Sequence, residues 1–335
     1  MKPRFAIIGC GRIAERHIVQ ATRTGVVSAV CDIIPEKAST WSAALSCPAF
    51  HSLEDLLSTP ETFDWAVICT PNGWHARQSI ACLEAGKNVL VEKPMCIAET
   101  DAQRMKAAAE KTGKSLVVVK QNRFNPPVLW LRNNIKQGAF GQLLGFQMNA
   151  LWHRPTAYFQ ESDWRGSLSM DGGALYTQFS HFIDLLIWLF GMPDTYGGTC
   201  ANLHHPAIET EDNGIIWMNM ENGLSGSFHY SLNTYRENFE GSLTVWGTEG
   251  QCKIGGQYLN KLIYAETRKD GTSIPPLTTA PSNDYGTYKG SMSNHDKVYD
   301  ELLLKQAGKP HQLPAMDESI QTVALIENIY SIIRP

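Results

Sequence analysis

Long apolar runs and clusters of basic residues are both missing from this 335-residue sequence. The most apolar stretch, residues 182–190, contains Asp184 and is far shorter than the roughly 20 residues that a membrane-spanning helix needs. The apolar residues 5–9 are likewise too few for the apolar region of a signal peptide. We therefore expect a cytoplasmic protein without a membrane partner. Because no basic run is available to neutralise a phosphate backbone, we expect no nucleic-acid partner either.

Signals for disulfides, repeats and metals are also missing. The eight cysteines form no Cys-x-x-Cys pair, which is typical of reduced, buried thiols, and no internal repeat is visible. One group of residues with metal-binding side chains consists of His204, His205, Glu209 and Asp212. Its spacing matches no zinc motif and it lies in an expected loop, so we interpret it as surface polar residues and expect no metal site.

What the sequence does contain is typical of a compact globular protein. It is 43% hydrophobic and 19% charged, with a net charge of -4. Its length exceeds that of a usual single domain, so we expect two domains, residues 1–121 and 122–335.

The first domain alternates short apolar runs with helical stretches, which is typical of a parallel sheet covered on both faces. The second contains longer alternating strands, typical of an open, mostly antiparallel sheet, and one strongly apolar helix. The fold class is therefore α/β followed by α+β. The expected strands are residues 5–8, 27–31, 65–69, 89–91, 116–119, 143–152, 214–220, 224–232 and 242–246; the expected helices are residues 13–24, 52–57, 75–85, 99–111, 128–136 and 173–190; residues 270–290 are expected to form a long loop or lid.

A dinucleotide-binding motif follows the first expected strand. Gly9-x-Gly11-x-x-Ala14 opens the first helix, and Asp32 ends the next strand about 20 residues later, where a carboxylate accepts ribose hydroxyls. A glycine turn without a ligand is the alternative, which the combination of strand, turn, helix and acid disfavours. Because Asp32 repels a 2′-phosphate, we expect NAD rather than NADP in a Rossmann fold. The expected NAD-binding residues are Gly9, Gly11, Arg12, Ile13, Asp32, Thr70, Asn72, His75, Glu92, Lys93, Gln121, Trp164 and Arg165.

Several further motifs carry a resemblance to a known family. Together with Gly9-x-Gly11-x-x-Ala14, Glu92-Lys93-Pro94 and the sequence from Gly172-Gly173 to His181-x-x-Asp184 resemble the glucose-fructose oxidoreductase, inositol dehydrogenase and rhizopine-catabolism (Gfo/Idh/MocA) family. Within it, the chain is similar to the UDP-N-acetylglucosaminuronate 3-dehydrogenases, which oxidise the C3 hydroxyl of a nucleotide sugar acid during surface polysaccharide biosynthesis. That similarity lies in residues 120–126, 164–166, 171–173, 178, 180–181 and 290–295.

Lys93 and His181 are the candidate catalytic residues. Oxidation of a secondary alcohol needs a group that takes the hydroxyl proton, and a neutral imidazole suits that role near pH 7. A lysine ammonium beside the same oxygen stabilises the developing alkoxide. Family members often carry an acid or amide four residues before the histidine, where this chain has Thr177. The alternatives are a core histidine and a solvated lysine at a strand end.

A substrate with a carboxylate and a diphosphate requires several cations. Five basic residues lie in segments expected to converge on the crevice, namely Lys93, Lys120, Arg123, Arg154 and Arg165. We expect two or three of them to contact substrate. The alternative is that some of them only form ion pairs with Glu161, Asp163 or Asp171. The expected substrate-binding residues are Lys93, Lys120, Arg123, Asn125, Arg154, Tyr158, Arg165, Thr177 and His181.

These observations predict an NAD-dependent sugar dehydrogenase that acts on a UDP-linked hexuronate. The alternatives are a dehydrogenase of a free sugar or inositol, a redox-neutral sugar hydrolase that retains NAD, and a non-catalytic NAD-binding regulator. A non-catalytic regulator needs neither Lys93 nor His181, so the presence of both residues argues against that alternative. We also expect a homo-oligomer, a dimer or tetramer, formed through the exposed face of the antiparallel sheet.

Overall fold

The computed structural model describes residues 2–59, 63–272, 274–279, 281–286 and 288–334. The chain forms two compact units. The first contains Met1–Lys120 and His295–Ala324, and the second contains Gln121–Asn294 and Leu325–Pro335. The expected boundary at residue 121 differs by one residue, but the assignment of everything beyond it to the second domain is wrong for His295–Ala324, which returns to the first unit.

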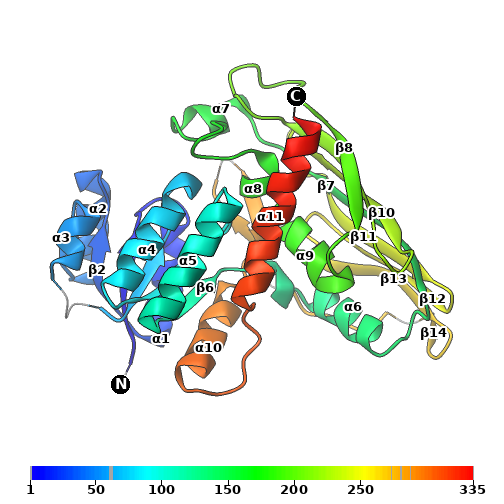
Figure 1. Ribbon diagram of the computed structural model, residues 1–335, viewed down its shortest axis with the longest axis horizontal. Helices are drawn as coiled ribbons and strands as arrows, with labels where there is room; N and C mark the ends of the chain where they lie inside the picture. The colour runs from blue at the N-terminus through cyan, green and yellow to red at the C-terminus, as the bar shows by residue number, and fades with distance from the viewer. Residues whose placement is uncertain (1, 60–62, 273, 280, 287, 335) are drawn as a thin grey trace. The chain divides into compact units, whose positions relative to one another are not determined.

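A six-stranded parallel sheet forms the centre of the first unit, with strand order β3-β2-β1-β4-β5-β6, which is the Rossmann order (Figure 1). Helices α4 and α5 lie side by side and pack on strands β4 to β6. The strands are β1 Arg4–Ile8, β2 Val26–Cys31, β3 Ala49–Phe50, β4 Trp65–Ile68, β5 Asn88–Val91 and β6 Leu116–Val118; the helices are α1 Ala14–Thr24, α2 Pro35–Leu45, α3 Leu53–Leu57, the 3-10 helix η1 Asn72–Trp74, α4 His75–Glu84, α5 Glu99–Thr112 and α10 His295–Gln306.

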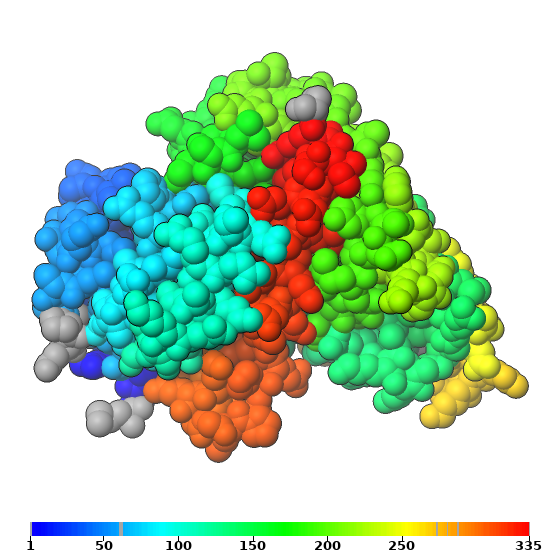
Figure 2. Space-filling model, in the orientation of Figure 1, coloured from blue at the N-terminus to red at the C-terminus, as the bar shows by residue number. Residues whose placement is uncertain are grey.

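The predicted parallel sheet is confirmed. Its central strands are almost entirely apolar and buried, as a sheet with two covered faces requires. Helix α2 and strand β3 were not predicted. Helix α2 buries only Ala38, so its sequence has no apolar stripe to indicate a helix. Helix α10 packs on α1, and Figure 2 shows its orange atoms beside the blue and cyan atoms of the first 120 residues.

An eight-stranded sheet forms the centre of the second unit, with strand order β14-β13-β12-β11-β7-β10-β9-β8. All neighbouring strands are antiparallel except β7 and β10, which confirms the mostly antiparallel sheet. The strands are β7 Leu143–Leu151, β8 Thr195–Ala201, β9 Asn213–Asn219, β10 Ser225–Ser231, β11 Glu240–Gly247, β12 Gly250–Gly255, β13 Lys261–Thr267 and β14 Gly271–Thr272; the helices are the 3-10 helix η2 Gln121–Phe124, α6 Pro126–Lys136, α7 Thr156–Gln160, α8 Ala174–Thr177 and α9 Ser180–Phe190.

Two expectations for this unit need correction. The single helix expected over residues 173–190 is two helices, α8 and α9, interrupted at Gln178 and Phe179. The long loop expected over residues 270–290 contains β14 and the hairpin strands β15 (Ser282–Asp284) and β16 (Lys289–Met292). Residues 273, 280 and 287 of that loop lie outside the described residues.

The last helix, α11 (Met316–Ile333), was not predicted and begins in the first unit and ends in the second. Within the described residues, no helix combines the length and the apolar composition needed to cross a membrane.

Candidate active site

The turn between β1 and α1 has the geometry of a pyrophosphate-binding loop. Gly9 adopts φ +89°, and a Cβ atom there would lie 2.8 Å from the backbone C of Cys69 and N of Thr70. A Cβ at Gly11 would meet no atom within 4 Å, so the backbone is open in front of the N-terminus of α1. Open backbone at a helix N-terminus suits a phosphate, so these residues fit NAD.

Asp32 follows β2 beside this loop. One of its carboxylate oxygens, Oδ2, accepts a hydrogen bond from the backbone N–H of Cys10 at 2.7 Å, and the other, Oδ1, accepts one from Ile34 at 2.9 Å. The half-buried carboxylate is thereby held at the end of the strand, where it suits ribose hydroxyls.

The loops after β4 and β5 are tied together by His75, the first residue of α4. Its Nδ1 lies 2.7 Å from the carbonyl oxygen of Pro94, and its Nε2 lies 2.8 Å from that of Thr70. Burial lowers the pKa of His75, while the two carbonyl contacts oppose that shift. Asn72 is buried in η1, and Lys93 is half-buried after β5. The structure thus brings the strand-end residues of the expected site together within the first unit.

His181 lies near the start of α9 and is buried in the second unit. The turn that precedes it is held by three residues that the sequence analysis missed. Glu211 Oε1 accepts hydrogen bonds from the Ala174 N–H at 3.1 Å and from the Tyr330 hydroxyl at 2.5 Å. Arg334 Nη2 donates to Glu211 Oε2 at 2.6 Å. The turn's start is therefore anchored to the C-terminal helix.

Gly173 shows why this turn requires glycine. It adopts φ +120°, and a Cβ atom there would lie 1.9 Å from Arg334 Nη2 and 2.5 Å from Tyr330 Oη. Any side chain would displace these two residues, which lie more than 150 positions further along the chain, so only an alignment or the fold would have identified them.

Thr177 ends α8 and binds an acid. Its Oγ1 donates a hydrogen bond to Asp171 Oδ1, and Asp171 Oδ2 accepts one from the Gly166 N–H at 2.9 Å. Burial raises the pKa of Asp171 to about 6, although these donors oppose the shift. A carboxylate is therefore present beside the position where family members often carry an acid.

Arg154, another expected substrate-binding residue, is buried among neutral groups. It donates from Nε and Nη2 to Gln178 Oε1 at 2.9 and 2.6 Å, and Gln178 Nε2 donates to the Tyr158 hydroxyl at 2.7 Å. The guanidinium lies over the rings of Trp152, Tyr158 and Tyr288. In the described part of the chain, no carboxylate accepts a hydrogen bond from Arg154.

The other expected substrate-binding residues of these segments have partners within the chain. Arg123 of η2 pairs with Asp184 of α9 through two 2.8 Å hydrogen bonds, so this ion pair joins the two helices. Arg165 pairs with Glu161, one of the acids named for that alternative. The remaining contacts are Lys120 Nζ to Thr322 Oγ1 at 3.4 Å, Asn125 Nδ2 to the Tyr258 carbonyl at 3.1 Å, Asn294 Nδ2 to Asn125 Oδ1 at 2.6 Å, and Gln121 Nε2 to Ser291 Oγ at 3.2 Å. The substrate and cofactor roles of these residues, and of the half-buried Trp164, stay predictions.

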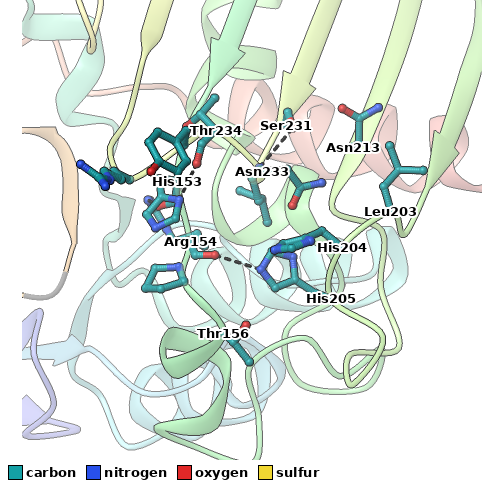
Figure 3. Close-up of a pocket in the computed structure, with 14 residues that line it drawn as sticks. His153, Arg154, Thr156, Leu203, His204, His205, Asn213, Ser231, Asn233 and Thr234 are labelled. Atoms are coloured by element: carbon teal, nitrogen blue, oxygen red, sulfur yellow. Dashed lines mark hydrogen bonds between the residues drawn. The ribbon is translucent and has the colours of Figure 1, made fainter.

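A pocket of about 520 Å³ lies at the end of strands β9 and β10 in the second unit (Figure 3). Its wall includes His205, whose Nδ1 lies 3.0 Å from Asp212 Oδ2 and whose Nε2 lies 2.9 Å from the Arg154 carbonyl oxygen. His205 and Asp212 are buried, so their interpretation as surface polar residues is wrong. Asp212 also accepts hydrogen bonds from three backbone N–H groups, those of residues 203–205, which makes it the organising residue of this loop.

Comparisons with known proteins agree with this geometry. Residues 3–120 match the oxidoreductase family model with an NAD-binding Rossmann fold, and residues 128–253 match the C-terminal domain model of the same family. The chain belongs to the Gfo/Idh/MocA oxidoreductase family. As a member of that family it is an NAD-dependent dehydrogenase that acts on a CH–OH group.

Two solved structures resemble the chain from end to end. The WlbA dehydrogenase from Bordetella pertussis, in complex with NADH and UDP-GlcNAcA, is 33% identical, with coverage of 100% of this chain and 97% of that chain and a TM-score of 0.87. The WlbA dehydrogenase from Chromobacterium violaceum, with the same ligands, is 31% identical, with coverage of 99% and 94% and a TM-score of 0.88. The scyllo-inositol 2-dehydrogenase (NADP(+)) IolW of Bacillus subtilis is 32% identical, but the match spans only 43% of this chain and 39% of that protein.

Proposed function

We propose that this dehydrogenase oxidises the C3 hydroxyl of UDP-N-acetylglucosaminuronate with NAD, as a step in surface polysaccharide biosynthesis. The observation that carries the proposal is the end-to-end similarity to two enzymes whose structures contain NADH and UDP-GlcNAcA. The similarity to the scyllo-inositol 2-dehydrogenase (NADP(+)) covers less than half of either chain, so it carries less weight for the substrate than the two end-to-end similarities.

The chemistry divides between two residues. His181 accepts the hydroxyl proton at an imidazole nitrogen, and its burial in α9 excludes water from that transfer. The Lys93 ammonium orients the alcohol and stabilises the negative charge that develops on its oxygen. Bound NAD supplies the acceptor for the hydride; Gly9, Gly11 and Asp32 would hold it.

Arg154 supports an acidic substrate. Its guanidinium stays cationic at all physiological pH values although burial lowers its pKa. Hydrogen bonds to amide and carbonyl oxygens satisfy its donors but do not neutralise its charge. A carboxylate or diphosphate on the substrate would supply the missing negative charge, which favours a sugar acid over a free polyol such as inositol.

The exposed face of the eight-stranded sheet supports self-association. Alternate residues of β9 are buried, while Ile215 and Trp217 between them are about half exposed, and Trp246 of β11 is also exposed. Apolar side chains in such a row favour a homo-oligomer, which light scattering of the purified protein would detect.

The function is tested by following NADH absorbance after addition of UDP-N-acetylglucosaminuronate, UDP-N-acetylglucosamine or inositol to purified protein and NAD. We expect turnover with the sugar acid and much slower turnover with the other two. The Lys93→Met variant serves as the negative control. Faster turnover with inositol would identify a polyol dehydrogenase, and NAD binding without turnover on any sugar would support a regulator.

A further inference from the structure

We propose that His17 and His295 are positioning residues, which hold the Glu92 carboxylate so that it fixes the backbone of Lys93. The role of Lys93 rests on the proposed function. All four residues belong to the first unit, although His17 and His295 come from opposite ends of the sequence.

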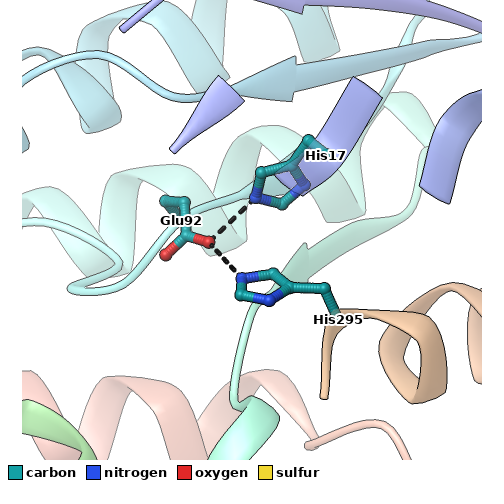
Figure 4. Close-up of side chains that lie close together, drawn as sticks. All are labelled: His17, Glu92 and His295. Carbon is teal, nitrogen blue, oxygen red and sulfur yellow. Dashed lines mark hydrogen bonds and ion pairs between the residues drawn. The ribbon is translucent and has the colours of Figure 1, made fainter. Parts of the chain in front are cut away.

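The geometry is that of a carboxylate held by three N–H donors, of which Figure 4 shows the two from histidine. Glu92 Oε1 lies 2.8 Å from His17 Nε2 of helix α1 and 3.3 Å from His295 Nε2 at the start of α10. Glu92 Oε2 accepts a hydrogen bond from the Lys93 N–H at 3.0 Å. Both histidines and Glu92 are buried, so these contacts replace hydration by water.

The hydrogen-bond pattern indicates which ring nitrogen of His17 carries the proton. His17 Nδ1 lies 3.0 Å from the Tyr299 hydroxyl, which can donate to it, while Nε2 faces a carboxylate that can only accept. Burial lowers the pKa of His17, which favours this neutral ring with its hydrogen on Nε2. His295 Nε2 faces the same carboxylate oxygen, so it also donates.

The surrounding groups leave Glu92 as the charged member of the cluster. Burial by itself would raise the pKa of Glu92, but the hydrogen bonds from His17 and His295 outweigh it and hold that pKa well below its ordinary value. Burial raises the pKa of the Cys69 thiol and of the Tyr299 phenol well above their ordinary values, so both stay neutral. The other titratable groups that face Glu92 are Lys93 and His75.

The consequence is a backbone held on both sides of Lys93. Glu92 binds the Lys93 N–H, and His75 binds the carbonyl oxygen of Pro94, the next residue. Without the histidines, the Glu92 carboxylate would lose its orientation and the lysine would shift. Because a misplacement of about 1 Å costs on the order of 100-fold in rate, a buried cluster that never touches substrate can control turnover.

The three ligand atoms also lie within 4.8 Å of one another, close enough to bind a metal ion. Donation from each histidine to the carboxylate accounts for the observed distances without one. Metal content is therefore part of the test.

The first experiment compares His295→Gln and His295→Leu, with His17→Gln and His17→Leu as the parallel pair. Glutamine places an N–H donor where the imidazole Nε2 lies, and leucine does not. We expect the leucine variants to lower kcat by about 10- to 100-fold with NADH affinity changed less than about threefold, and the glutamine variants to recover most of kcat. Equal loss in the glutamine and leucine variants, or a loss confined to NADH affinity, would overturn the positioning role.

A second experiment does not depend on the substrate. In protein labelled with nitrogen-15 at histidine, we expect His17 to show a neutral ring protonated at Nε2 at pH 7, because burial lowers its pKa. We expect His295 to carry a proton on Nε2, the nitrogen that faces Glu92. The glutamine variants assign the signals. A ring of His17 or His295 without a proton on Nε2, or a stoichiometric metal that is lost in His295→Leu, would contradict the proposal. If wild-type protein oxidises no UDP-sugar acid, the proposed function fails while this spectrum still decides the hydrogen-bond arrangement around Glu92.

Discussion

Thr177 Oγ1 donates a hydrogen bond to Asp171 Oδ1, with 2.5 Å between the two oxygens. Thr177 stands where family members often carry an acid or amide, four residues before His181. The chain thus retains a carboxylate near that position, one hydroxyl group away.

The raised pKa of Asp171 predicts a specific pH dependence of stability. Burial moves this pKa from 3.8 to about 6, so the folded state binds a proton more tightly than the unfolded state. The free energy of unfolding should therefore fall as pH rises from about 4 to about 6, by at most about 3 kcal/mol. Urea denaturation across this range measures it.

Asp171→Asn should remove this contribution, leaving a flatter profile between pH 4 and pH 6. The exposed Asp101→Asn, whose partner Arg104 is also exposed, is the matched control and should leave the slope unchanged. A slope that persists in Asp171→Asn would assign the titration to another group.

Asp32 predicts the cofactor preference. NAD should bind much more tightly than NADP, because the carboxylate repels a 2′-phosphate. Asp32→Ala should weaken NAD binding and narrow the gap, as measured by titration of protein fluorescence with each reduced cofactor. Equal affinities in the unmutated protein would contradict this role.

Lys93→Met should lower turnover by a factor on the order of 100 or more, because the developing alkoxide loses its cation. NADH affinity should stay nearly unchanged. The control is Lys87→Met. Lys87 directly precedes strand β5, whereas Lys93 follows the other end of that strand, and Lys87 Nζ donates to the Phe63 carbonyl. Full activity in Lys93→Met would show that the lysine does not act on the reacting hydroxyl group.

The role of His181 predicts the pH profile of turnover. With the UDP-sugar acid, kcat should rise with pH, because only neutral imidazole accepts the proton. His181→Asn should remove that rise while both ligands still bind. An unchanged profile in the variant would assign the base to another residue.

Arg154 predicts discrimination between acidic and neutral sugars. Arg154→Gln should raise KM for UDP-N-acetylglucosaminuronate more than for UDP-N-acetylglucosamine. The difference between the two substrates should correspond to about 1–3 kcal/mol of binding free energy. Arg268→Gln, at an exposed ion pair with Glu249, is the control. An equal change for both sugars would remove Arg154 from recognition of the acid.

The Rossmann sheet, the position of the cofactor loop and the preference for NAD were predictable because their determinants are local. Gly9, Gly11 and Asp32 each follow a short apolar strand, and parallel strands bring their carboxyl ends to one edge of the sheet. The antiparallel sheet was likewise visible in alternating residues, since one of its faces is buried and the other exposed. Helix α2 was not predicted, because it buries only one residue and its sequence therefore shows no apolar periodicity.

Only the tertiary structure decided which distant residues meet. His295 returns to the first unit, where its Nε2 lies 3.3 Å from Oε1 of Glu92, a residue about 200 positions earlier. Similarly, Arg334 Nη2 donates a hydrogen bond to the carbonyl oxygen of Gly172 in the turn before α8. The five expected substrate cations likewise look equivalent in the sequence, yet Arg123 is paired with a buried acid while Arg154 is surrounded by neutral groups. A sequence pattern reports which side chains are buried, but a buried polar group takes its partner from whichever element packs against it, and that partner is set by long-range packing.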